Sequence, residues 1–149
     1  MKKFQFTLDR IKQYRIQIEE MEKNDLAALR SQLSLLEEQA EEIRKAIAAK
    51  SEELRRLYRK GAFPNEISVA NRYLTFKKQE LEMKFAEIDE KNKEIENKLQ
   101  DVLEATQEVK KMEKLEEHQL EEYKQQEIKE NENFIEEFFG AGKQQTAEE

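Results

Sequence analysis

The feature that most constrains the fold of this chain is an apolar side chain that recurs every seven residues in its second half. A strict seven-residue repeat places these side chains along one stripe of an α-helix and implies a left-handed supercoil with a partner helix. We therefore predict a long helix over about residues 66–138, with the repeat at the d positions of a coiled coil. The repeat comprises Ile67, Leu74, Leu81, Ile88, Ile95, Val102, Val109 and Tyr123, with one interruption at Glu116.

The other expected seam row of this helix, the a positions, is more polar. An asparagine buried at an a position lowers stability but specifies the register and the number of helices. The sequence therefore predicts that Asn71 and Asn92 lie in the seam. The complete row is Asn71, Lys78, Phe85, Asn92, Leu99, Thr106, Glu113 and Leu120.

The first half of the chain carries a second stripe, with apolar residues at alternating steps of three and four. Disordered segments share the high charged content, 41% here, but have no reason to keep such a period. We predict a helix over about residues 4–60, with a four-residue stutter after Glu22. Its seam comprises Phe4, Leu8, Ile11, Arg15, Ile18 and Glu22, then Leu26, Leu29, Leu33, Leu36, Ala40, Ile43, Ile47, Lys50, Leu54 and Leu57.

One turn is predicted, at residues 61–65. Gly61 suits the left-handed residue that closes a helix, Pro64 cannot continue the first helix, and Asn65 can cap the next one. The predicted fold is all-α: two long helices in an antiparallel coiled-coil hairpin, forming a single domain over residues 1–139 with a flexible tail over 140–149. The numbers of paired residues then add to about 126, so Phe4 meets the region of Glu122 and the second helix overhangs by about four turns.

The composition argues against catalysis. There is no cysteine, so thiolate chemistry and disulfides are excluded, and His118 is the only histidine, at an outward position. Neighbouring carboxylates such as Glu121 and Glu122 are expected on a solvated helix face, where nothing separates their pKa values. We expect no enzyme activity, no cofactor and no metal. No apolar run of membrane-spanning length and no signal-peptide core is present, so a cytoplasmic location is expected.

Apolar side chains outside the seam indicate where partners bind. Val69, Phe76 and Met83 occupy outward f positions, and Tyr73 lies between the first two, so we predict a docking site near the bend that also includes Tyr58 and Phe63. A second cluster, Phe134, Ile135, Phe138 and Phe139, lies on the overhang. The alternatives are that the first set packs in a self-associated helical bundle, and that the second folds back onto Phe4 and Phe6.

Charge is unevenly distributed. Residues 44–78 carry ten Lys and Arg against three Glu, whereas residues 100–149 carry 15 acidic and 6 basic side chains. The basic segment offers affinity for phosphate in principle, but the overall charge of −7 argues against nucleic acid as a partner.

Several segments resemble the bacterial flagellar export protein family FliJ. The opening Phe4-Gln5-Phe6-Thr7-Leu8-Asp9-Arg10-Ile11, followed by Arg15, is similar to the start of that family. The Gly61 bend, the pair Tyr73-Leu74, the segment Lys111–Leu115 and the acidic stretch that ends in Phe138-Phe139 are also similar. The resemblance covers residues 1–139. The sequence Gly140-Ala141-Gly142 departs from it, because relatives often remain helical and charged there.

The resemblance implies a stalk-like coiled coil of the flagellar type III export apparatus, with no enzyme activity of its own. Its implied partners are the hexameric export ATPase, the cytoplasmic domain of the export gate and the substrate chaperones, at the cytoplasmic face of the plasma membrane but without direct membrane insertion. The ATPase ring would hold the terminal residues Phe4, Leu8, Phe134, Ile135, Phe138 and Phe139. The gate would bind Tyr58, Phe63, Val69, Tyr73, Phe76 and Met83. A generic structural spacer or helical-bundle interaction module is the alternative.

Overall fold

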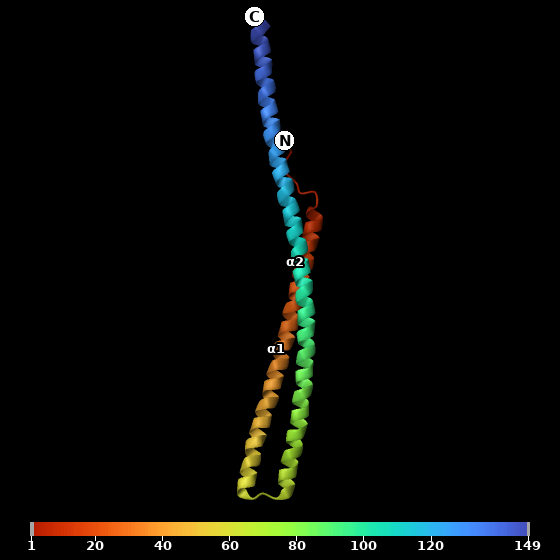
Figure 1. Cartoon of the computed structure of the whole chain (residues 1–149), viewed down its shortest axis with the longest axis vertical. Helices are drawn as coiled ribbons and strands as arrows, with labels where there is room; N and C mark the ends of the chain where they lie inside the picture. The colour runs from red at the N-terminus through yellow and green to blue at the C-terminus, as the bar shows by residue number, and fades with distance from the viewer. Residues whose placement is uncertain (1, 149) are drawn as a thin grey trace. The chain divides into compact units, whose positions relative to one another are not determined.

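A computed structural model describes the backbone of residues 2–148 and the side chains of residues 2–142. Helix α1 spans Asp9–Lys60 and helix α2 spans Pro64–Glu148, and the described residues contain no strand (Figure 1). The all-α helical hairpin predicted from the sequence is confirmed. Its contacts fall into two units, Met21–Leu103 and Met1–Glu20 with Glu104–Glu149, which are described separately below.

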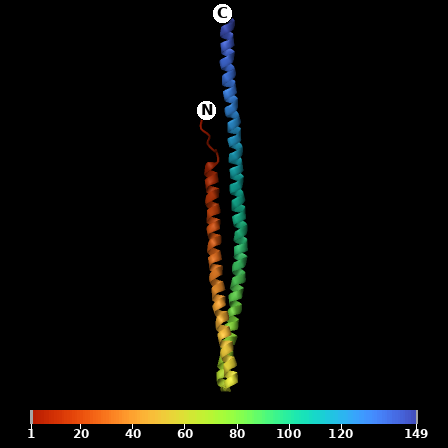
Figure 2. The same ribbon diagram turned by 90° about the vertical axis from the view of Figure 1, so that its left-hand side faces the viewer.

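In the first unit, residues 21–103, α1 and α2 run antiparallel and side by side on either side of the bend (Figures 1 and 2). Gly61 has a φ of 74°, as predicted for the residue that closes α1, and the Ala62 N–H donates to the Leu57 carbonyl at 3.0 Å. The Phe63 carbonyl accepts the N–H groups of Glu66 and Ile67, at 3.0 and 3.3 Å. The residue that caps α2 is therefore Phe63, and Pro64 begins the helix.

The prediction that Asn65 caps α2 is therefore wrong. Proline favours the first position of a helix, because its φ is already helical and its missing N–H would have no partner there. The bend is accordingly shorter than predicted, with only residues 61–63 outside the two helices.

In the second unit, α1 begins at Asp9 and not at Phe4. Residues 2–6 are non-helical and residues 7–8 form a turn, which the Asp9 N–H closes by donating to the Phe6 carbonyl at 3.2 Å. The Lys12 N–H then donates to the Leu8 carbonyl at 2.9 Å in the first turn of α1. On a helix, Phe4 and Phe6 would point to nearly opposite faces, so only one could reach α2. Outside a helix both are covered: Phe4 is half-buried and Phe6 is 8% exposed.

Helix α2 also continues past the predicted end near residue 138, to Glu148. Gly140 and Gly142 lie within it, and a helical glycine costs only about 1 kcal/mol relative to alanine. The residues that follow, from Lys143 to Ala147, include several good helix formers.

From Leu26 to Leu57 the seam of α1 agrees with the prediction, since all ten positions are buried or half-buried. Upstream, the prediction is wrong at Ile11, which is 43% exposed. In α2 the d row is also buried or half-buried throughout. The predicted a row is wrong over most of its length, because six of its eight residues, Asn71 and Asn92 among them, are exposed, while Thr106 and Leu120 are half-buried. The row that flanks the d positions on their other side is covered instead: Ala70, Lys77, Lys84, Lys91, Lys98, Ala105, Met112 and Gln119.

Compared with the prediction, α2 is rotated about its axis, so that this row and not the a row faces α1. Two properties of the row explain the rotation. Ala70 and Ala105 are small, so α1 can approach closely where they lie, and both are buried. Between them, lysine stems cover apolar surface while their ammonium groups reach polar partners.

No helix in the described part of the chain combines the length and apolarity needed to cross a bilayer.

Candidate interaction surfaces

A row of four lysines is the most regular polar feature of the unit formed by residues 21–103. Lys77, Lys84, Lys91 and Lys98 recur every seven residues, and each is followed three residues later by a carboxylate. The ion pairs within α2 join them to Glu80, Glu87, Glu94 and Asp101, at 3.0 to 3.7 Å. Three of the lysines also reach α1, where Lys84 donates to Gln39, Lys91 to Gln32 and Lys98 to Glu22.

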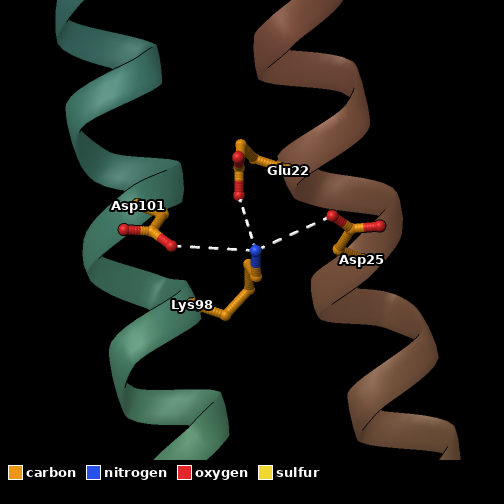
Figure 3. Close-up of polar contacts among 4 residues, drawn as sticks. All are labelled: Glu22, Asp25, Lys98 and Asp101. Atoms are coloured by element: carbon orange, nitrogen blue, oxygen red, sulfur yellow. Dashed lines mark hydrogen bonds and ion pairs between the residues drawn. The ribbon is translucent and has the colours of Figure 1, made fainter.

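Lys98 has the most charged surroundings of the row. Its ammonium group lies 2.9 Å from Glu22, 3.7 Å from Asp25 and 3.7 Å from Asp101, so carboxylates of both helices converge on one cation (Figure 3). The hydrogen bond to Glu22 raises the pKa of Lys98 above its usual value, against the opposing effect of desolvation. Lysine-to-glutamine and lysine-to-carboxylate bonds of this kind fix which residues of the two helices face each other.

The six apolar residues predicted to dock a partner near the bend are all exposed, and we call them the bend surface. They comprise Tyr58, Phe63, Val69, Tyr73, Phe76 and Met83. Phe63, directly after the turn, is 76% exposed, and Phe76 is 63% exposed. Phe76 also lines a shallow groove of about 600 Å³ along the first turns of α2, together with Pro64, Ile67 and Arg72.

Tyr73 differs from the rest of the bend surface. It is 37% exposed, and its ring lies 5.2 Å from the ammonium nitrogen of Lys50 and 5.7 Å from that of Lys77. These distances are within the range of cation–π contacts. Tyr73 thus flanks the seam beside the lysine row, while Val69, Phe76 and Met83 point farther from α1.

The overhanging part of α2 carries an exposed aromatic cluster, which we call the terminal surface. Phe134 and Phe138 are each 69% exposed, Ile135 and Phe139 are also exposed, and the rings of Phe138 and Phe139 meet edge to face at 6.0 Å. Phe4 packs on Tyr123 with ring centroids 5.5 Å apart, about three turns before Phe134. The structure therefore does not join Phe4 or the half-buried Leu8 to this cluster.

The fold-back of the terminal surface onto Phe4 and Phe6 does not occur in the described residues, because Phe6 is buried and the overhang is exposed. Phe4 and Phe6 instead cover the seam of the second unit, where Thr7 donates to Gln119 and Lys12 pairs with Glu116. The Lys12–Glu116 hydrogen bond raises the pKa of Lys12. These contacts define the point beyond which α2 has no partner helix.

The residues weighed for acid–base chemistry, His118, Glu121 and Glu122, are exposed in the part of the chain that the structure describes. His118 is exposed and lies 3.2 Å from Glu122, with which it forms an ion pair only when its imidazole is protonated. No group of three or more His, Asp or Glu side chains there could hold a metal ion.

The sequence matches no family model, and neither a curated protein nor a solved structure matches it at a significant level. The resemblance to the FliJ family therefore rests on the sequence motifs quoted above.

Proposed function

We propose that this chain is a non-enzymatic, stalk-like component of the flagellar type III export apparatus. In this role the terminal surface binds the ring of the export ATPase, the bend surface binds the cytoplasmic domain of the export gate, and the hairpin also contacts substrate chaperones. Its working location would be the cytoplasmic face of the plasma membrane. The sequence motifs shared with the FliJ family are the source of the partner identities.

The observation that best supports this proposal is the terminal surface itself. Helix α1 begins at Asp9, and the chain before it is non-helical and accepts a hydrogen bond from Tyr123 at the Lys2 carbonyl, so more than twenty residues of α2 extend without a partner helix. Large apolar side chains exposed on such a segment lower the solubility of a free protein, and a contiguous set of them marks an interaction site. A single helix of this kind fits inside a ring of subunits, where all its faces are contacted.

A structural spacer would not need either aromatic surface. A self-associating helical bundle remains the second candidate, and one observation favours it: Phe85, Leu99 and Leu103 are partly exposed on the side of α2 opposite the lysine row. Light scattering of the purified chain separates the two, since a bundle predicts a stable oligomer at micromolar concentration.

The test of the proposal is a truncation after residue 123. This change removes the terminal surface but keeps the Lys12–Glu116, Thr7–Gln119 and Phe4–Tyr123 contacts, so helicity and cooperative unfolding of the remaining hairpin should be unchanged. We expect the truncated chain to lose its stimulation of ring assembly and ATP hydrolysis by the export ATPase. Stimulation should also fall with rising salt, because exposed charge pairs are screened.

A full-length variant separates the effect of the aromatic rings from the effect of shortening the overhang. Phe134→Ala with Phe138→Ala keeps the length and charge of the overhang and removes only two exposed rings. It should reduce stimulation at least tenfold, since aromatic anchors carry most of the binding energy of an interface. Full stimulation by the truncated chain would refute the assignment of the terminal surface to the ATPase.

A further inference from the structure

The bend carries a concentration of unpaired positive charge that the export role does not use. Between residues 55 and 72 the chain has five Lys and Arg and a single acidic residue, Glu66, although its overall charge is −7. All five cations are exposed. Arg55 lies 3.7 Å from Glu52, whereas no ion pair within the described residues involves the other four, Arg56, Arg59, Lys60 and Arg72.

These cations surround an apolar residue. Phe63 lies in the turn between the helices, three residues from Lys60 and four from Arg59, and is the most exposed of the large apolar side chains that the structure describes. At 1.5 Å per residue, Arg55 and Arg72 lie within about 15 Å of the bend along their helices. Tyr58, one turn before the end of α1, adds a second exposed ring at 60%.

We propose that the bend docks on an anionic lipid surface, with the basic side chains on the headgroups and the Phe63 ring at the level of the interface. Clusters of four or more Lys and Arg are attracted to anionic leaflets, and aromatic rings favour the boundary between headgroups and acyl chains. The contact is interfacial, so it does not require any helix to enter the hydrocarbon. This proposal does not depend on the export role, and its test uses no export protein. It assigns Phe63 and Tyr58 to lipid, so that the gate would contact the remaining four residues of the bend surface.

The geometry favours a lipid surface over the two other classes of anionic partner. An acidic protein would need a hollow shaped to accept a convex turn with arginines on both of its sides, whereas a fluid bilayer adapts to a convex tip. Nucleic acid is bound mainly through phosphate contacts, and a proline-flanked phenylalanine in a tight turn adds nothing to such contacts. The acidic remainder of the chain is repelled by an anionic surface, which favours contact through the bend alone.

The experiment measures binding of the full chain to extruded vesicles by sedimentation, using phosphatidylcholine alone or with about 30% phosphatidylglycerol. We expect binding only to the anionic vesicles, weakening as salt rises from about 50 to about 300 mM. Each basic residue near such a surface is worth about fivefold in partitioning, so Arg56→Gln with Arg59→Gln and Lys60→Gln should lower it about a hundredfold.

A matched triple change controls for net charge. Lys110→Gln with Lys114→Gln and Lys124→Gln removes the same charge from exposed positions far along α2 and should leave vesicle binding within about twofold of the unmodified chain. Because the chain has no tryptophan, Phe63→Trp adds a single indole whose emission should shift to the blue with anionic vesicles only. Circular dichroism verifies that each variant remains helical.

Three results would overturn the proposal. They are absence of binding to anionic vesicles at low salt, an equal loss of binding in the two triple variants, and an indole emission that does not change. Binding of duplex DNA or of an acidic polypeptide through the same bend residues, without binding to vesicles, would assign the basic bend to that partner instead.

Discussion

Lys98 occupies a position in the seam where coiled coils usually carry an apolar side chain. Its ammonium group contacts carboxylates from both helices, and its stem lies against the seam, so the charge stays compensated while the methylenes are covered. Lys12, in the other unit, pairs across the two helices with a single carboxylate, Glu116. In both lysines the carboxylate partner raises the pKa above the ordinary 10.5.

The raised pKa of Lys98 gives stability a defined pH dependence. A higher pKa in the folded chain than in the unfolded chain means that folding favours the protonated form. The contribution is therefore complete below pH 10.5 and is lost as pH rises through the folded pKa. We expect the free energy of unfolding, from urea titrations between about pH 7 and about pH 12, to fall less steeply above pH 10.5 in Lys98→Met than in the unmodified chain.

Lys114 provides the control for this prediction. It is exposed, and no ion pair within the described residues involves it, so Lys114→Met should leave the alkaline slope unchanged. Equal slopes for Lys98→Met and the unmodified chain would mean that the Glu22 contact does not form in solution.

At the scale of the element, the lysine row makes α2 a helix whose seam is specific but weakly apolar. Lys84 and Lys91 donate to Gln39 and Gln32 of α1, and their side chains are 19% exposed. Replacing covered polar groups by apolar ones of similar size is often stabilising, because the desolvation of the charge no longer opposes folding. The polar row therefore limits the stability of the hairpin while it fixes the register.

A double substitution tests this limit. Lys84→Leu with Lys91→Leu should raise the free energy of unfolding by about 1–3 kcal/mol, measured by urea denaturation followed by circular dichroism. The exposed pair Lys78→Leu with Lys93→Leu should change it by less than about 0.5 kcal/mol. A loss of stability in the Lys84 and Lys91 variant would show that the cross-helix hydrogen bonds outweigh apolar burial.

The d row and the left-handed Gly61 could be predicted because each depends on spacing or on one residue's own conformational freedom. The choice of the second seam row could not. The a and g positions flank d on opposite sides, and the outcome depends on close approach at Ala70 and Ala105 and on lysine partners in α1. The polarity of Asn71 and Asn92 favoured the a row, because asparagine has a known role at that position. The sequence feature that marks the covered row is the carboxylate three residues after each of its lysines.

That the candidate surfaces are exposed was easier to predict than which residues belong to each of them. Val69, Phe76 and Met83 are exposed because f positions point away from α1 whichever row flanks the d positions. Tyr73 is less exposed than expected, because the face of α2 that meets α1 brings it beside Lys50 of α1, while Lys77, one turn along α2, covers its ring as well. Phe4 and Leu8 do not join the terminal surface. This was not predicted, because the spacing of apolar residues alone does not show that the helix begins only at Asp9.

At the scale of the whole molecule, the two candidate surfaces belong to different units: the bend surface to residues 21–103, and the terminal surface to the other. Under the proposed function, the two binding activities should therefore be separable by mutation. Phe76→Ala with Met83→Ala removes exposed side chains outside the seam, so the melting temperature should change by no more than about 2 °C.

This variant should weaken binding to the soluble cytoplasmic domain of the export gate at least tenfold and leave ATPase stimulation unchanged, as measured by calorimetry and by phosphate release. The truncation after residue 123 should do the reverse. A clear drop in melting temperature with unchanged gate binding would instead assign Phe76 and Met83 to self-association.

None of the side chains that the structure describes is fully buried, since two helices in a pair leave each other's outer faces open. Few positions therefore face strong steric selection, and those that do are specified by spacing more than by identity. During evolution most residues of such a chain can be substituted, while the heptad spacing, the glycine turn and the positions of the exposed aromatic residues are retained. Homologous chains with this architecture would be recognised by the spacing of their apolar residues after their sequence identity had become too low to detect.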